Sequence, residues 1–555
     1  MGKNRERRES LVYHAKPRPG KIEVVPTKKY NSQRDLAIAY SPGVAIPCQE
    51  IEKDPSTVYK YTNKSNLVAV ISNGTAVLGL GDIGPAASKP VMEGKALLFK
   101  IFADIDVFDI EINEKDPDKF IDVVKSISTT FGGINLEDIK APEAFKIERE
   151  LVDQLDIPVM HDDQHGTAII SAAALLNALE LVNKNIKDVK IVVSGAGAAA
   201  IACTKLYISF GAQLKNIFMT DSKGVINKSR EGLSKEKKYF ATSKQIDTLE
   251  QAMIDSDVFI GLSMANILSE KMLKTMSRDP IVFAMANPDP EISYDKAMSV
   301  RDDIIFATGR SDLPNQVNNV LGFPFIFRGA LDVRATKINE EMKKAAVVAL
   351  AELAKKPVPE QVNIAYDETK LNFGKDYIIP KPFDPRLISE IPPAVAKAAI
   401  DSGVAQEPIT DWDKYTQILD ERLGNNQKLI RIIHRRARKA KEKKLVFTEA
   451  DHLDVLKAAQ ICFEEKIAEP ILLGRKKIIE ELMESLDFNE NLQIIDPTDK
   501  VNKELIEEYS KILFKKLKRK GKTLDDVKRL LRGRDYFGSM MVENGDADCM
   551  LSGYS

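Results

Sequence analysis

The sequence predicts an α/β protein built on a doubly wound parallel sheet, and one segment carries most of that prediction. Residues 190–226 have the pattern of a strand, a tight glycine turn, a helix and a second strand. The later segments SDVFIGLS, DPIVFAMANP and DIIFATG have the apolar, β-branched composition of buried parallel strands. At 555 residues the chain is too long for one hydrophobic core, so we expect about three or four domains.

Changes in composition divide the chain into successive segments. The predicted divisions are a charged arm or helix at 1–35, a first α/β domain at 36–160, a nucleotide-binding domain at 161–400, a helical linker at 401–445 and a further α/β region at 446–555. In the first domain, the β-rich runs NLVAVISNGTAVLGL and DIDVFDIEI alternate with the helical runs EGKALLFKIFA and FIDVVKSISTTF.

Three shorter features refine this division. The apolar run at 168–182 is too short to span a bilayer and predicts a buried helix. Prolines between 357 and 393 predict an extended segment that closes the nucleotide-binding domain. From 446, a helix is expected to precede the strand PILLG, and NGDADCMLSGYS is expected to form a strand and a turn.

Charge and cysteine content exclude several classes of protein. The net charge is −1, so no overall field attracts nucleic acid or an anionic membrane. The basic run at 431–444 has no interleaved aromatic residues and is interpreted as a solvated helical face or a connector. The four cysteines form no CxxC pair, and the amino terminus has no apolar signal region. These features predict a cytoplasmic protein without nucleic-acid or membrane partners.

The glycine turn has the pattern of a dinucleotide-binding site. Gly195, Gly197 and Ala200 occupy the G-x-G-x-x-G/A positions, and the helix that begins near Ala198 would face the pyrophosphate. Asp221 ends the second strand, where a ribose-binding carboxylate belongs. A purely structural tight turn is the alternative, and the flanking strand and Asp221 favour the nucleotide. The sequence therefore predicts NAD or NADP.

Four further segments resemble the malic enzymes. The segments are DLAIAYSPGVAIPCQ at 35–49, NGTAVLGLGDIGPAASKPVMEGKALLFK at 73–100, GGINLEDIKAPEAFKIERE at 132–150 and IPVMHDDQHGTAII at 157–170. The resemblance is to the bacterial form with a carboxy-terminal phosphotransacetylase-like domain, and it covers most of residues 15–400. AYSPGVA, GLGDIG with EGK, NLED and HDDQHGTA are each long enough to be specific to that family.

The resemblance implies a metal site made of carboxylates. Glu137, Asp138 and Asp163 offer hard oxygen ligands suited to Mg²⁺ or Mn²⁺. An isolated Glu–Asp pair is usually a solvated acidic loop, but the family match at both segments favours the metal. His161 and His165 are expected to act as local hydrogen-bonding groups.

The resemblance also assigns the acid–base groups. Lys95 becomes the general base, which requires its pKa to be lowered by burial and neighbours. Tyr40 becomes the proton donor, placed in a hydrophobic turn, and Asp162 orients Lys95 or the metal site. On the residues alone, a solvated lysine and a tyrosine of the core are the competing interpretations.

Three asparagines follow predicted strands at the carboxyl edge, where ligands of such sheets bind. Similarity to the family assigns Asn287 and Asn318 to the malate carboxylates, and Asn287 and Asn319 to the nicotinamide cofactor. Loop capping is the competing interpretation for all three. One position departs from the family: animal malic enzymes carry an arginine directly before LGLGD, where this chain has Val77. We expect Lys89, or backbone amides near Asn73–Gly74, to replace that arginine.

The implied reaction is the oxidative decarboxylation of L-malate to pyruvate and CO₂. Lys95 would take the proton of the C2 hydroxyl, the nicotinamide would take the hydride, and Tyr40 would protonate C3. Asp221 favours NAD, whereas Ser222 and Lys223 offer sites for a 2′-phosphate, and the bacterial family favours NADP. A plain 2-hydroxy-acid dehydrogenase is the alternative, but it would not need the three carboxylates.

The last region resembles the start of phosphotransacetylases, through PILLGR, DPTDK and NGDADCMLSG. It is shorter than such a domain, so we expect a regulatory or oligomerising role, with acetyl-CoA as an effector, rather than acyl transfer. A non-catalytic acyl-CoA sensor is a further alternative for the chain. The resemblance implies a homodimer or a higher homo-oligomer, to which Tyr13 and Tyr30 of the arm would contribute.

Overall fold

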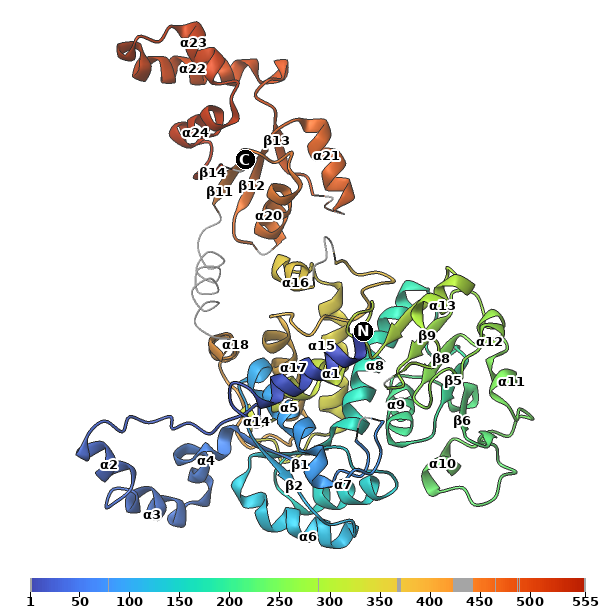
Figure 1. The fold of residues 1–555 in the computed structure, drawn as a ribbon. Coiled ribbons are helices and arrows are strands. Elements are labelled where there is room, and N and C mark those ends of the chain that lie inside the picture. Colours follow the sequence, from blue (N-terminus) through green and yellow to red (C-terminus); the bar gives the residue numbers. More distant parts are fainter. Residues whose placement is uncertain are drawn as a thin grey trace. The chain divides into compact units, whose positions relative to one another are not determined.

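The computed structural model describes residues 2–77, 79–287, 289–366, 371–422, 443–464, 466–486, 488 and 490–553 (Figure 1). It contains two compact units, residues 1–423 and 424–555. The predicted α/β fold with parallel sheets is confirmed in both. Among the described residues, no helix combines the length and the apolar character needed to cross a membrane.

The first unit begins with a helical arm. Its elements are α1 (Gly2–Ala15), α2 (Gln33–Ala39), α3 (Ala45–Lys53), η1 (Pro55–Thr57), α4 (Val58–Tyr61) and η2 (Asn63–Asn66). Ser32 starts α2 with a capping box that includes Asp35. Neither α2 nor α3 has a buried residue, and Figure 1 shows both standing apart from the sheets of this unit. Large apolar side chains are exposed here, among them Val24, Val25, Tyr30, Leu36, Ile38, Tyr40 and Ile46.

The first sheet has the order β2-β1-β3-β4, and all its strands are parallel. Its strands are β1 (Leu67–Ser72), β2 (Asp106–Glu111), β3 (Gly133–Leu136) and β4 (Val159–His161), connected through α5 (Pro85–Ala103), α6 (Pro117–Ile127), η3 (Ser128–Thr130) and α7 (Glu143–Gln154). Leu136 pairs with His161, so β3 and β4 end side by side. The residues that follow these two strands therefore meet at one edge of the sheet.

The second sheet has the order β10-β9-β8-β5-β6-β7, in which only β7 is antiparallel. Its strands are β5 (Ile191–Ser194), β6 (Ile217–Asp221), β7 (Gly224–Val225), β8 (Val258–Gly261), β9 (Ile281–Ala284) and β10 (Ile305–Thr308). The three apolar segments predicted as buried parallel strands are β8, β9 and β10. The connecting elements are α9 (Ala198–Ser209), η4 (Leu214–Asn216), α10 (Lys235–Tyr239), α11 (Leu249–Met253), α12 (Glu270–Lys274), α13 (Tyr294–Val300) and η5 (Asn319–Leu321).

Helix α8 (Asp162–Leu181) links the two sheets and confirms the predicted buried helix. It starts directly after β4, without a loop, and packs against α9 and α15 (Glu340–Lys355). Most of its residues are buried, so it is apolar on all sides rather than along one stripe. The chain thus passes from the first sheet to the second through a buried helix.

The predicted extended segment at 357–393 is confirmed only for residues 371–386, which form no helix or strand. It contains α16 (Glu360–Ala365) and the first half of α17 (Leu387–Asp401), which holds Pro392 and Pro393 inside the helix. Helix α17 packs on α14 (Phe323–Asp332), where Gly329 lets the two backbones approach: a Cβ there would lie 2.6 Å from the Pro392 carbonyl oxygen. This packing outweighs the local cost of the prolines.

The second unit holds a parallel sheet of order β13-β12-β11-β14. Its elements are β11 (Lys444–Phe447), α20 (Leu453–Glu464), β12 (Glu469–Leu473), α21 (Lys476–Ser485), β13 (Gln493–Ile495), η6 (Lys500–Asn502), α22 (Lys503–Leu517), η7 (Lys518–Lys520), α23 (Leu524–Leu530), α24 (Arg534–Asn544) and β14 (Cys549–Leu551). The expected helix before PILLG and the expected terminal strand are α20 and β14. Most of the basic run at 431–444 lies outside the described residues, and the described part of the predicted linker contains α18 (Trp412–Arg422).

Candidate active site

Two pairs of acidic residues meet at the edge where β3 and β4 end. Glu137 and Asp138 follow β3, and Asp162 and Asp163 begin α8 directly after β4. One carboxylate oxygen from each of Glu137, Asp138 and Asp163 lies within 4.8 Å of the other two. The three residues predicted as metal ligands are therefore brought together by the register of two adjacent strands.

Asp138 is held in an unusual backbone conformation. Its φ of 53° lies in the left-handed region, which non-glycine residues seldom adopt. Its N–H donates to Asp163 Oδ2 at 2.8 Å, and its carbonyl accepts the N–H groups of Thr75 and Ala76 at 3.1 and 3.0 Å. Such strain persists only where surrounding contacts enforce it, and it clusters at functional sites.

The chemistry of this set fits a hard divalent cation. Glu137 and Asp138 are almost fully buried. Burial, together with the neighbouring charges of Asp163, Asp162 and Asp138, raises the pKa of Glu137 well above its usual range. A cation that accepts oxygen ligands would offset this repulsion, and all three groups are oxygen donors.

Lys95 extends from α5 into the same cluster. Its Nζ lies 2.7 Å from Asp162 Oδ2 and 2.9 Å from Glu137 Oε1, and 4.2 Å from the centre of the Phe323 ring. The expected lowering of its pKa is wrong for this arrangement. Burial lowers the pKa of Lys95, but the adjacent carboxylates outweigh burial and raise it. Lys95 is therefore an ammonium ion here.

Asp162 lies between Lys95 and Asn319, whose Nδ2 donates to Asp162 Oδ2 at 2.7 Å. Burial raises the pKa of Asp162, against the opposing effect of Lys95. Gly166, one helical turn later, leaves room for this side chain, since a Cβ there would lie 2.0 Å from Asp162 Oδ1. The glycine of HDDQHGTA is thus a requirement of the site that residue-type reasoning did not single out.

The other two asparagines have different surroundings. Asn318 caps η5, because its Oδ1 accepts the Val320 N–H at 3.1 Å. The side-chain oxygen of Asn318 therefore has the loop-capping role that the sequence offered as the alternative to ligand binding. Asn287 is exposed beyond the end of β9. A Cβ on Gly309, just after β10, would lie 3.3 Å from Asn287 Oδ1, which places Asn287 at the carboxyl edge of two adjacent strands.

Tyr40 is not in a hydrophobic turn, so that expectation is wrong. It ends α2 and is 78% exposed. Because α2 buries none of its residues, nothing in this segment can enclose the ring. Within its own chain, Tyr40 therefore lies outside the buried cluster around Lys95.

The expected substitutes for the missing arginine are engaged elsewhere. Lys89 Nζ lies 2.5 Å from Asp109 Oδ2 and 3.6 Å from Glu111 Oε2. The N–H of Gly74 donates to Ser72 Oγ at 2.9 Å. Lys89 is therefore paired with acids on β2 in this structure, and its role in binding the substrate carboxylate stays a prediction.

The glycine turn between β5 and α9 has the geometry that the sequence predicts. Gly195 has a φ of 116°, and a Cβ there would lie 2.5 Å from the Leu262 carbonyl oxygen, so no side chain fits. Gly197 precedes α9, which begins at Ala198, and its Cβ position is open. Ala200 is buried against the core. The backbone at this helix start is therefore accessible to a pyrophosphate.

Asp221 ends β6 as predicted, but two basic residues hold its carboxylate. Arg230 Nη1 and Lys237 Nζ each lie 2.9 Å from it, and the Lys223 N–H donates to it at 3.0 Å. Although burial opposes ionisation, these contacts hold the pKa of Asp221 far below its usual range. Ser222 and the side chain of Lys223 are exposed. The sequence reasoning missed Arg230 and Lys237, although the basic stretch at 228–238 was a visible signal.

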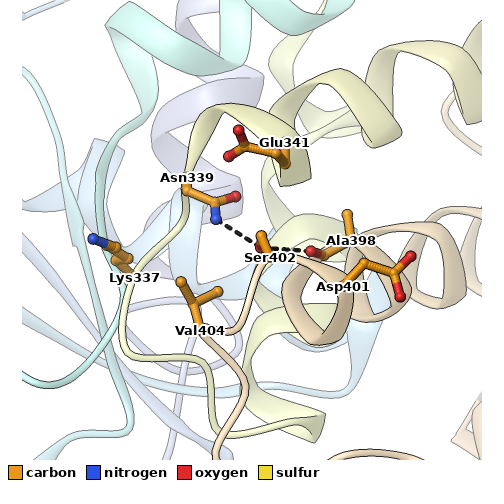
Figure 2. A pocket seen from close by; sticks show the side chains of 7 residues that line it. All are labelled: Lys337, Asn339, Glu341, Ala398, Asp401, Ser402 and Val404. Carbon is orange, nitrogen blue, oxygen red and sulfur yellow. Dashed lines mark hydrogen bonds between the residues drawn. The ribbon is translucent and has the colours of Figure 1, made fainter.

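A cavity of about 640 Å³ lies beside the start of α15 (Figure 2). Asn339 Nδ2 donates to Ser402 Oγ at 2.8 Å, and Ser402 Oγ donates to the Ala398 carbonyl at 2.6 Å. These polar groups satisfy one another, and none of the predicted site residues lines the cavity. This cavity is therefore separate from the carboxylate cluster.

Comparison with known proteins agrees with this geometry. Residues 19–152 match the model of the malic enzyme N-terminal domain, 164–367 that of the malic enzyme NAD-binding domain, and 428–555 that of phosphate acetyl/butaryl transferases. An NADP-dependent malic enzyme of Escherichia coli is 54% identical over 99% of this chain and 72% of its own length. An NAD-dependent malic enzyme of Rhizobium meliloti is 48% identical over 98% of this chain and 71% of its own length. The crystal structure of a malic enzyme from Pyrococcus horikoshii has a TM-score of 0.69 and 39% identity, covering 78% of this chain and 99% of the other.

Proposed function

This chain belongs to the malic enzyme family, and on that premise we propose that it converts L-malate to pyruvate and CO₂ with NADP as its preferred hydride acceptor. We propose that Glu137, Asp138 and Asp163 hold Mg²⁺ or Mn²⁺. The observation that carries the proposal is the placement of Lys95 against Glu137 and Asp162, beside three convergent carboxylates. When bound, the metal supplies a Lewis acid that polarises the C2 oxygen of the substrate.

Lys95 takes the proton of the C2 hydroxyl. The nicotinamide, held at the glycine turn, would supply the acceptor for the hydride of C2. To take that proton, Lys95 must lose the ammonium proton that its acidic partners now stabilise. A divalent cation held by Glu137, Asp138 and Asp163 would repel the ammonium form of Lys95, and this repulsion would favour the neutral amine. Asn319 keeps Asp162 in place through the bond at 2.7 Å. Asn287 and Asn318 are proposed to bind the substrate or the nicotinamide.

Tyr40 is proposed to protonate C3 of the enol that forms as CO₂ leaves. Since this residue is exposed in its own chain, a second copy would have to bring the ring to the cluster. Its segment has the surface that such pairing requires, because Leu36, Ile38 and Ile46 are each more than half exposed. We therefore propose a homodimer or a higher homo-oligomer in which this arm takes part.

The preference for NADP has a local explanation. A free Asp221 would repel a 2′-phosphate, but here its single charge faces Arg230 and Lys237. The pair leaves a net positive charge beside the ribose position, and phosphate recognition uses such groups. NAD lacks the 2′-phosphate and would gain nothing from this charge.

The second unit is proposed to act in regulation or assembly, with acetyl-CoA as an effector, since it matches the transferase model. A cytoplasmic location is proposed because the four cysteines are free thiols, as reducing compartments favour.

The proposal is tested by following cofactor reduction with L-malate, with and without Mn²⁺, using NADP⁺ and NAD⁺ separately. We expect reduction that depends on the metal, proceeds faster with NADP⁺ and yields pyruvate in equal amount. Accumulation of oxaloacetate in place of pyruvate would instead identify a plain 2-hydroxy-acid dehydrogenase. No turnover with either cofactor, in a chain that binds them, would contradict the proposed reaction.

The cofactor preference is tested with Lys237→Ala and Arg230→Ala. A hydrogen bond to a charged group contributes about 1.5–3 kcal/mol, so each variant is expected to raise the KM for NADP about 10- to 100-fold. The KM for NAD should change little, because NAD lacks the 2′-phosphate. Lys238→Ala, an exposed neighbour on α10, is the matched control. Equal losses with NAD and NADP would show that the two residues only maintain the fold.

A further inference from the structure

The residues 161–165, which we call the acid turn, carry two acids of the site between two histidines. His161 ends β4 and precedes α8, but its side chain does not cap the helix. A side-chain cap would bind free N–H groups of the first turn and fix its position. The acid turn therefore depends on contacts from other elements to keep its position.

One of these contacts comes from the metal-site side. Asp163 Oδ2 accepts the N–H of Asp138 at 2.8 Å, which joins the acid turn to the loop after β3. This bond holds Asp163 through the very carboxylate that is proposed to bind the metal. An independent contact is needed to fix the backbone of the turn itself.

Glu148 of α7 supplies that contact. Its Oε1 accepts the backbone N–H of His161 at 2.8 Å. The Nε2 atom of His165 lies 3.0 Å from Oε1 and 3.1 Å from Oε2. One carboxylate thus binds the residue before Asp162–Asp163 and the residue two positions after Asp163.

The surroundings keep Glu148 charged. Its side chain is only 13% exposed. Burial opposes ionisation, but His165, Lys343 and His161 hold the pKa of Glu148 at about 2. The group is therefore an anion throughout the range in which the enzyme would work, and hydrogen bonds to a charged acceptor are the strong ones.

We propose that Glu148 is a positioning residue for the metal site: by holding both ends of the acid turn, it sets the distance from Asp163 to Glu137 and Asp138. The inference rests on the proposed metal ligation by these three residues. Carboxylates behind the ligands of a metal site orient those ligands, and their loss costs about 10- to 100-fold in metal affinity.

The test measures Mn²⁺ binding to the full chain without substrate, by electron paramagnetic resonance of the free ion. In Glu148→Gln the side chain keeps its size, but the amide group replaces one acceptor oxygen with a donor. We expect the Kd for Mn²⁺ to rise about 10- to 100-fold. The Kd for NADP, read from protein fluorescence, should stay at the wild-type value, because the glycine turn does not contact Glu148.

Two further variants make the test specific. His165→Leu removes the contact after Asp163 but leaves the His161 N–H bond, so it should weaken Mn²⁺ binding less than Glu148→Gln. Arg149→Ala changes the next residue of α7, which is exposed. Glu148, Arg149 and His165 all line a second cavity, of about 530 Å³, beside the acid turn. Arg149→Ala should bind Mn²⁺ like the wild type.

The outcomes separate the positioning role from general stability and from the proposed function. Wild-type Mn²⁺ affinity in Glu148→Gln, even with a lowered Tm, overturns the positioning role and leaves the proposed function intact. If Glu148→Gln does not fold, wild-type Mn²⁺ affinity in a folded His165→Leu variant also overturns the positioning role. Absence of Mn²⁺ binding in the wild type overturns the metal site, and the positioning role with it.

Discussion

Replacing Lys95 with alanine is expected to lower kcat about 10²- to 10⁴-fold, the range that a positioned acid–base group contributes. Lys95 is the buried cation of the site, with its Nζ 2.7 Å from Asp162 and 2.9 Å from Glu137. Without it, the cluster loses the amine that is proposed to take the C2 hydroxyl proton. NADP affinity should be unchanged, because the glycine turn does not involve Lys95.

Steady-state kinetics and Mn²⁺ titration of Lys95→Ala distinguish this role from metal ligation. Removing a cation leaves the carboxylates more negative, so Mn²⁺ affinity should not fall. Lys100→Ala is the matched control, since Lys100 lies on the same helix and pairs with Asp104 and Asp106 at the surface. A Lys95→Ala enzyme with wild-type kcat would eliminate Lys95 as the base.

The second large effect is expected for Asp163→Asn. This change keeps the shape of the side chain and an oxygen for the Asp138 N–H, but it removes one of three ligand charges. We expect Mn²⁺ affinity to fall by more than about 100-fold. Loss of a residue that only orients the ligands costs about 10- to 100-fold, and the loss of a ligand should cost more. Turnover should fall in parallel and recover partly at high Mn²⁺.

Calorimetric titration with Mn²⁺, together with activity at increasing Mn²⁺, measures both parts of this expectation. Asp118→Asn serves as the control, because Asp118 is an exposed acid at the start of α6 in the same part of the fold. Normal Mn²⁺ binding by Asp163→Asn would show that the ion, if bound, is held by other groups.

The set of three acids could be predicted through the resemblance to the malic enzymes, and the strand ends explain why the three meet. Glu137, Asp138 and Asp163 each lie within two residues of a parallel strand, and strands of this kind end at a common edge. The glycine turn was predictable for a similar reason, since Gly195 must adopt a positive φ where no side chain fits. In both places a local pattern determines the geometry.

What could not be predicted depends on contacts between distant parts of the chain. The protonation of Lys95 follows from Asp162, 67 residues later, and the neutralisation of Asp221 follows from Arg230 and Lys237. Pro392 lies in a helix because α14 packs against it, which no local propensity expresses. Proton affinity is set by the neighbours of a group, so residue type alone does not determine it.

The direct passage from β4 into α8 has a consequence for engineering chimeras between relatives. Asp162 contacts Lys95 of α5, and Asp163 accepts the N–H of Asp138 after β3, so both acids make contacts in the first domain. They are nevertheless the first residues of α8, a helix that packs against α9 and α15. A crossover point before residue 162 would transplant these acids together with the cofactor site, and would pair them with a foreign Glu137 and Asp138. A crossover between the end of α8 at Leu181 and the start of β5 at Ile191 would exchange the determinants of cofactor choice and leave the native acids in place.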